Sequence, residues 1–314
     1  MPLDLDELLR FKREMTSSNK GDHFLTLGIE VDETAINYAQ LSMAYSDAIV
    51  GDPETGVIHG GSITSLLDTT CGFASATTLD ELGLTPTIDL RIDYMRPATP
   101  GKKVIAEAEV YRSTEFVIFS RAIAHHGDKE RPIARGVGNF FRLNADAFAD
   151  IRTAFRKGEV DKLFPAAYLK SAPLINRDDY PLAADQELQD FKAWVPYANT
   201  LGMEILEGDN YCVLPPRQSN VGNFSLPALH GGAIAGFMEM SAVIAVIKKT
   251  GISRIPKIVD ISVDYLRAGL FKDTYSRCKV NYLGQRMVNV SITAWQDSED
   301  KPIANARAQF LLKD

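Results

Sequence analysis

The chain has 314 residues, of which 45% are hydrophobic, and its formal net charge at pH 7 is −7. This length can bury a large core and predicts about two domains. The acidic balance, with no basic run or stripe, argues against a nucleic-acid groove, so no nucleic-acid partner is expected.

Cysteine usage and apolar runs indicate the compartment. Cys71, Cys212 and Cys278 are far apart and odd in number, which predicts neither a disulfide framework nor a metal site and is typical of a reducing compartment. The first residues are acidic and amphipathic, without an apolar signal core. The longest apolar run, residues 233–247, is too short to span a bilayer and has Glu239 near its centre. We therefore expect a cytoplasmic protein with no membrane contact, no metal and no cofactor.

In chain order, the first predicted element is a short helix over about residues 3–15, followed by one or two strands near Leu27-Gly28. A helix-like run over 61–78 comes next and is small or apolar except for Asp68. Alternating apolar and polar residues then predict strands at 88–94, 103–112, 116–125 and 132–143. Because the turns between these strands are short and contain no crossover helix, the sheet should be antiparallel.

The second half repeats this order. The tripeptide His-Gly-Gly at 59–61 recurs at 230–232, and an acid stands nine positions after each histidine, first Asp68 and then Glu239. Colinear blocks of this kind indicate an internal duplication. We predict a first repeat at 1–143, a connector at 144–183 and a second repeat at 184–314.

The counterpart elements follow from the duplication. A leading helix is expected at 185–194 and a central helix at 232–249, and 259–269 (VDISVDYLRAG) matches 88–98 (IDLRIDYMRPA) with the same offset as the two His-Gly-Gly tripeptides. The remaining strands are predicted at 258–266, 274–282, 287–295 and 302–312. The connector should be helical over 145–156 and then form turns.

The acids need an explanation because the run around Asp68 has no strong polar face and therefore predicts a buried helix. A buried carboxylate requires hydrogen-bond donors or a positive potential. For Asp68 alone, access to solvent or to the hydroxyl of Thr64 or Thr69 would be enough. Its recurrence as Glu239, with the charge kept, favours a functional role instead.

The glycines limit how such a site can be built. The N–H groups at the start of a helix can receive an anion, although Gly60-Gly61 could also be only a tight turn. Gly60 and Asp68 are eight positions apart, about 12 Å along a helix, and cannot both contact one reacting carbonyl. If the two central helices pack antiparallel about a pseudo-twofold axis, Asp68 meets the N–H of Gly231, and Glu239 meets that of Gly60. We therefore predict two cross-helix sites.

The pattern H-G-G-x-I-x(4)-[DE], found twice within a helix-and-antiparallel-sheet unit, resembles hotdog-fold acyl-CoA thioesterases of the phenylacetate-pathway type. The resemblance covers residues 20–143 and 195–314. It implies an α+β fold of two hotdog repeats, each a sheet wrapped around a central helix, packed as a pseudo-twofold double hotdog. The implied activity is hydrolysis of an acyl-CoA to free acid and CoA, with a carboxylate as nucleophile or general base and a glycine N–H polarising the thioester oxygen.

Carried onto this sequence, the resemblance makes Asp68 and Glu239 the catalytic acids and Gly231 and Gly60 the oxyanion glycines. Some relatives add a hydroxyl at the start of the next strand, which is Thr87 in the first repeat. The matching residue in the second repeat is Ile258.

Others place an Asn shortly before the histidine. Pro53 occupies that place in the first repeat, whereas Asn223 lies one position away from it in the second. We expect one nearly complete site, with Asp68, Thr87 and Gly231, and one degraded site around Glu239.

Several further residues are candidates for substrate binding. They are Asn223, His59, His230, Gly61, Gly232, Arg96 and Arg267. The two histidines precede the glycines and more often shape such a turn than take part in chemistry. The two arginines flank the helices and are expected either to meet a CoA phosphate or to be solvated.

Two other functions remain open. A hotdog dehydratase or hydratase would need a catalytic histidine, for which His59 is the candidate in the first motif. A non-catalytic acyl-CoA-binding module is favoured by the helpers missing from the second site. The paired sheets would leave an outer face free, so we also expect a homodimer of tandem chains.

Overall fold

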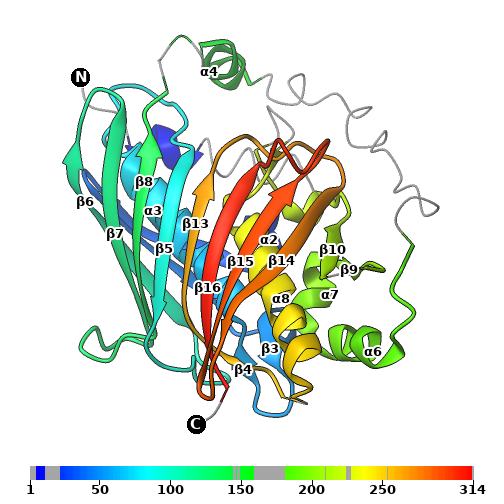
Figure 1. Ribbon diagram of the computed structural model, residues 1–314. Coiled ribbons are helices and arrows are strands. Elements are labelled where there is room, and N and C mark those ends of the chain that lie inside the picture. The colour runs from blue at the N-terminus through cyan, green and yellow to red at the C-terminus, as the bar shows by residue number, and fades with distance from the viewer. Residues whose placement is uncertain are drawn as a thin grey trace.

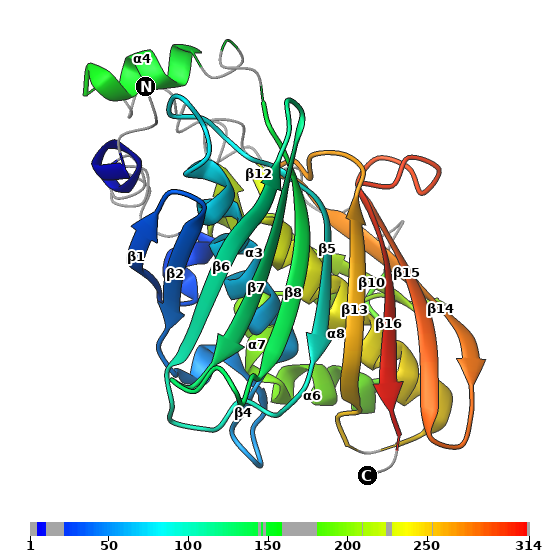
Figure 2. The same ribbon diagram turned by 90° about the vertical axis from the view of Figure 1, so that its left-hand side faces the viewer.

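The computed structural model describes residues 5–10, 22–143, 146, 149–158, 181–208, 210–223, 228–252 and 254–312, without the side chain of Asn223. These residues form a continuous twelve-stranded antiparallel sheet in the order β1-β2-β6-β7-β8-β5-β13-β16-β15-β14-β10-β9. Two long helices, α3 (Gly60–Ala76) and α8 (Gly231–Thr250), pack side by side on one face of this sheet (Figures 1 and 2).

The two repeats contribute matching elements. The first supplies β1 (Ile29–Ala35), β2 (Tyr38–Met43), β5 (Thr87–Tyr94), β6 (Val104–Ser113), β7 (Val117–His125) and β8 (Ala134–Phe141). The second supplies β9 (Glu204–Ile205), β10 (Tyr211–Leu214), β13 (Lys257–Tyr265), β14 (Thr274–Leu283), β15 (Met287–Trp295) and β16 (Ala304–Leu311). Two small hairpins precede the long helices, β3 (Val50–Asp52) with β4 (Val57–Ile58) and β11 (Val221–Asn223) with β12 (Ala228–Leu229).

Shorter helices surround this frame. They are a helix over 5–10, α2 (His23–Thr26), η1 (Asp47–Ile49), α4 (Ala149–Arg156), α6 (Gln186–Trp194), α7 (Pro196–Leu201) and η4 (Gln218–Asn220). The helix over 5–10 and α4 contact each other through an ion pair between Glu7 and Arg156. Leu8 and Phe155 belong to one small apolar cluster there.

The pseudo-twofold axis passes through the seam between β5 and β13. Asp93 pairs with Asp260 and Asp89 with Asp264, so the register is the same when the two strands are exchanged. Arg91 and Ser262 pair at the centre of this register, and they occupy corresponding positions of the two repeats. The expected double hotdog is therefore present, and its two repeats are joined into one continuous sheet by the pairing of β5 with β13.

Glycines allow the two helices to touch. A Cβ on Gly61 would lie 2.7 Å from the Cα of Gly236, and one on Gly232 would lie 2.5 Å from the Cα of Ser65. No side chain fits at either distance, so glycine is required at these contacts. Each helix start is thereby placed beside the middle of the other helix, which is the antiparallel arrangement predicted from sequence.

Burial explains the apolar character of α8. The helix runs over 231–250 and is longer than the apolar run 233–247, which was too short to span a bilayer. The length and composition of the whole helix would suit a membrane span. However, 89% of its most apolar window is buried inside the protein. Its apolar side chains thus pack against the sheet and against α3.

Most predicted elements lie within a few residues of the observed ones, and β15 has the predicted bounds. The first helix is described only over 5–10, so residues 3–4 and 11–15 of that prediction lie outside the described residues. The same holds for residues 144–145, 147–148 and 159–180 of the connector. Helix α7 was not predicted, although it packs against α8. The division at residues 143 and 184 stays a prediction.

Candidate active site

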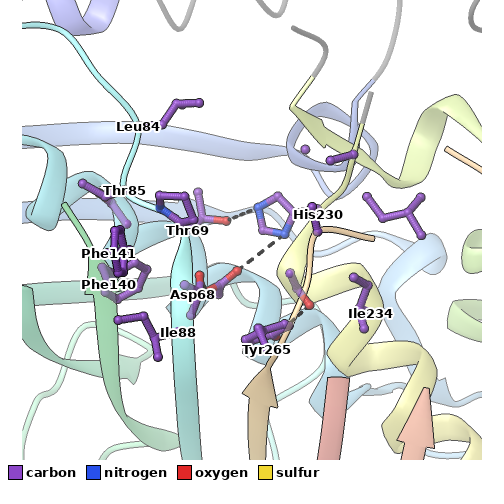
Figure 3. Close-up of a pocket in the computed structure, with 18 of the residues that line it drawn as sticks. Asp68, Thr69, Leu84, Thr85, Ile88, Phe140, Phe141, His230, Ile234 and Tyr265 are labelled. Carbon is purple, nitrogen blue, oxygen red and sulfur yellow. Dashed lines mark hydrogen bonds and ion pairs between the residues drawn. The ribbon is translucent and has the colours of Figure 1, made fainter. Parts of the chain in front are cut away.

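The carboxylate of Asp68, at the middle of α3, lies at the amino end of α8 (Figure 3). The hydroxyl of Thr87, the first residue of β5, donates to Asp68 Oδ1 at 2.8 Å. A Cβ on Gly231 would lie only 3.0 Å from Asp68 Oδ2. The structure therefore brings together Asp68, Thr87 and Gly231, three residues that the sequence assigned to one site.

His230 shapes the start of α8. The N–H of Gly232 lies 2.9 Å from His230 Nδ1 and is shared with the Asp68 carboxylate. His230 Nε2 lies 3.2 Å from the hydroxyl of Thr69, which donates its own proton to the carbonyl of Ser65. Nε2 must therefore carry the proton, and Nδ1 is the acceptor. Both ring nitrogens are used, so the turn-shaping interpretation of this histidine fits its contacts.

The pKa of Asp68 reflects two opposed influences. Burial is the larger influence and raises the pKa, whereas the hydrogen bonds from Thr87 and Gly232 lower it, and the net pKa is about 6 instead of 3.8. The result is a carboxylate that is ionised near neutral pH and still more basic than an exposed aspartate. Such a group suits either a nucleophile or a general base.

A cavity of about 520 Å³ opens beside Asp68. Both repeats contribute to its wall, and apolar side chains such as Leu84, Phe140 and Ile234 are frequent there (Figure 3). Gly231 also faces it, and among the described residues no acceptor is paired with the Gly231 N–H. That donor belongs to the start of α8, where a developing negative charge is favoured.

The second acid has different surroundings. Tyr94 donates to Glu239 Oε2 at 2.9 Å, and the Gly61 N–H also bonds to this carboxylate. Burial is the largest influence and raises the pKa of Glu239 to about 8. A Cβ on Gly60 would overlap Glu239 Oε1, so the acid is pressed against the start of α3. Glu239 does not line the large cavity.

Tyr197 of α7 covers the start of α3, next to which Glu239 lies. Its ring stacks on His59 with centroids 4.7 Å apart, and a Cβ on Gly61 would lie 2.8 Å from that ring. His59 Nδ1 accepts the N–H of Gly61, and burial lowers the pKa of this histidine to about 4. The tyrosine is fully buried and packs directly against Gly61 and Gly236.

His23 holds the matching place in the first repeat, four positions before Leu27 as Tyr197 is before Leu201. Its ring lies 5.3 Å from that of His230, and its Nε2 lies 3.0 Å from the Ser65 hydroxyl. Neither His23 nor Tyr197 was predicted near the site. The Leu-Gly blocks that follow them were the only sequence signal of their equivalence.

The remaining predicted residues are less well supported. Arg96 is exposed, bonds to the carbonyl of Pro132 at 2.9 Å, and does not line the cavity. Arg267 does line it, while bonding to the carbonyl of Pro302 at 2.5 Å. The side chain of Asn223 lies outside the described residues. A substrate-binding role for Arg96 therefore has no support from its position, because it does not line the cavity beside the acid.

Comparison with known proteins gives the family. The model of the thioesterase superfamily matches residues 55–133 and 226–303, once in each repeat and half of the chain in total. The chain therefore belongs to the thioesterase superfamily, as a tandem hotdog.

Particular relatives agree with this. The chain is 30% identical over 116 residues to the medium/long-chain acyl-CoA thioesterase YigI of Salmonella typhimurium, covering 33% of this chain and 74% of that protein. A solved structure from Novosphingobium aromaticivorans covers 90% of this chain and 98% of its own, with a TM-score of 0.62 and 15% identity. The tesB protein of Mycobacterium avium subsp. paratuberculosis covers 92% and 98%, with a TM-score of 0.57 and 11% identity. At these identities the two structures show the fold alone.

The raised pKa of Glu239 predicts a pH-dependent stability. The folded protein keeps this proton up to about pH 8, whereas an unfolded chain releases it near pH 4.5. Between these values the folded state binds more protons, so its stability falls as pH rises. Glu239→Gln removes this loss and should raise Tm at pH 9 by a few degrees more than at pH 5.

Thermal denaturation of both proteins from pH 5 to 9 measures this difference. The fall caused by Asp68 is present in both proteins and cancels when the two curves are subtracted. Parallel curves over the whole range would contradict a buried, titrating Glu239.

Proposed function

We propose that this protein is an acyl-CoA thioesterase whose working site is formed by Asp68, Thr87 and the amino end of α8. The observation that carries the proposal is the position of the Asp68 carboxylate, which lies against Gly231 at the wall of a largely apolar cavity. A base, an oxyanion donor and a space for an acyl group are the parts that thioester hydrolysis needs. The relative YigI carries the same activity in its name.

In this mechanism the thioester carbonyl oxygen accepts a hydrogen bond from the Gly231 N–H, which stabilises the negative charge of the tetrahedral intermediate. Ionised Asp68 either removes a proton from the attacking water or attacks the carbonyl carbon itself, forming an anhydride that water then cleaves. The C–S bond breaks in both routes, and the CoA thiolate leaves and takes up a proton. Thr87 and Gly232 keep Asp68 oriented and favour its ionised form.

The alternatives have weaker support. A dehydratase would use a histidine, but His59 accepts the Gly61 N–H and is stacked under Tyr197. A purely binding module would not need a carboxylate with a pKa near 6 beside a helix-end donor. The second site fits a structural role better, since Tyr94 donates a hydrogen bond to Glu239 and Tyr197 covers the adjoining start of α3.

Asp68→Asn should abolish most of the activity while leaving the fold intact, because the amide is nearly isosteric but is neither a base nor a nucleophile. We expect kcat to fall by about 10²- to 10⁴-fold, as is common for a lost acid–base group. Glu239→Gln is the matched control and should change kcat by less than about threefold. Thiol release from a panel of acyl-CoAs measures both.

Circular dichroism confirms that both variants are folded. Equal losses in the two variants would contradict a single working site. Normal turnover by Asp68→Asn would remove Asp68 from the mechanism.

The pH profile should report Asp68 directly. Activity needs the carboxylate, so kcat/KM should fall as pH drops through about 6. Thr87→Val removes the donor to Oδ1, destabilises the charged form and should move this acid limb to higher pH. Thr87→Ser keeps the hydroxyl and should leave the limb near its original position.

Initial rates with one acyl-CoA from pH 5 to 9 give all three profiles. If Thr87→Val and Thr87→Ser have the same limb as the unchanged protein, Thr87 does not act on the ionisation of Asp68.

We further propose that two tandem chains associate in the cytoplasm. All three cysteines are free and buried, as suits a reducing compartment. Exposed apolar side chains occur at corresponding hairpin ends and on the outer face of the sheet, namely Tyr111, Phe116, Val137, Tyr282, Leu283 and Met287. Light scattering at micromolar concentration should give twice the chain mass, and a value near 34.6 kDa would contradict association.

A further inference from the structure

Beyond the acid, the part of α3 that borders the cavity consists of small residues together with one large side chain, Phe73. Thr69, Gly72 and Ala76 follow Asp68 along this face and all line the cavity. A Cβ on Gly72 would meet only one atom within 4 Å, Cε1 of Phe140 at 3.6 Å, which is an ordinary contact. The open space next to Gly72 therefore exists because this residue has no side chain.

The corresponding face of α8 is filled. With the offset that relates the two His-Gly-Gly tripeptides, Thr69, Gly72 and Ala76 correspond to three larger residues, Met240, Val243 and Ile247. All three are buried in the core. The helix that carries Asp68 thus borders an open space, and the helix that carries Glu239 has side chains at the same positions.

We propose that Gly72 and Ala76 determine which acyl chains this site accepts, with the chain lying along α3 from Asp68 towards the helix over 5–10. This inference rests on the proposed thioesterase function and names the chemical class of the acyl group as an unbranched aliphatic chain of about ten carbons. Phe73, Leu84 and Leu8 border the far end, so the surroundings are apolar there.

The chain length follows from helix geometry. Gly72 and Ala76 are four and eight positions beyond Asp68, or about 6 and 12 Å along the axis. Carbon–carbon bonds of about 1.5 Å in a zigzag advance about 1.3 Å each, so a chain starting at Asp68 passes Gly72 near its fifth or sixth carbon and reaches Ala76 near its tenth. Each buried methylene should improve affinity by about fourfold until the space ends.

Two substitutions should therefore cut the accepted length at different points. Gly72→Val places the residue of the second repeat at this position, which α8 shows to be compatible with a central helix. It should bind a four-carbon chain within about twofold of the unchanged protein and weaken eight- and ten-carbon chains by about tenfold or more. Ala76→Val should spare the four- and eight-carbon chains and weaken the ten-carbon chain.

The probes are S-butyl-, S-octyl- and S-decyl-CoA, thioethers that bind without being hydrolysed, measured by calorimetry. The matching butyryl-, octanoyl- and decanoyl-CoA are assayed for thiol release in parallel. Gly72→Ala is the control for the gain in helix propensity on replacing glycine, and its single methyl group should change all three affinities by less than about threefold.

The expected result is a length cut-off that moves by one helical turn between the two valine variants. A loss in Gly72→Val that is equal for the three chain lengths, or no loss at all, would overturn the inference even if the protein hydrolyses acyl-CoAs. Length-dependent thioether binding with the expected cut-offs, but without thiol release from any acyl-CoA, would support the subsite and contradict the thioesterase proposal instead.

Discussion

The closeness of α3 to α8 is the constraint on which the rest of the structure depends. Gly61 rests on Gly236, and Gly232 rests on Ser65, at distances where even a methyl group would force the helices apart. This contact fixes the start of one helix against the middle of the other. The N–H groups of a helix end and a buried carboxylate are thereby brought within hydrogen-bonding range, although they belong to different repeats.

One packing geometry supports two different acids. Asp68 has the Thr87 hydroxyl and an adjoining cavity, and burial raises its pKa only to about 6. Glu239 is one methylene longer and reaches the Tyr94 hydroxyl, and its pKa rises to about 8. At neutral pH the first acid is mostly ionised and the second mostly protonated. The same fold thus holds one mostly ionised carboxylate beside a cavity and one mostly protonated carboxylic acid that is a buried hydrogen-bonding group.

The sequence predicted most of this arrangement because a repeat carries spatial information. The constant offset between the two copies and the rise of an α-helix, combined with the assumption that the central helices pack antiparallel, placed Asp68 next to Gly231 in the partner repeat. The sheet strands followed from their period of two. These signals are local or symmetric, and they do not depend on how loops pack.

What the sequence did not predict depends on tertiary contacts. Tyr197 lies over His59 because the short helix α7 folds back onto the start of α3, and no periodic pattern marks such a return. The N–H of Gly232 is shared between His230 and Asp68, and this depends on the exact orientation of the backbone at the start of α8. Arg96 stood at a plausible strand end, but its guanidinium reaches the neighbouring loop carbonyl of Pro132 instead. The pattern of residues along the chain does not predict tertiary contacts of this kind.

The presence of both repeats in one chain has a consequence for how such a protein can change over time. In a symmetric pair of identical chains, any residue altered in one wall is altered in the other, so a substitution that closes one site closes both. Joining the repeats in one chain removes this obligation. The space next to Gly72 can remain open while its counterpart Val243 packs in the core. The stability gained by packing one repeat can then offset the stability that an open, partly polar site costs in the other.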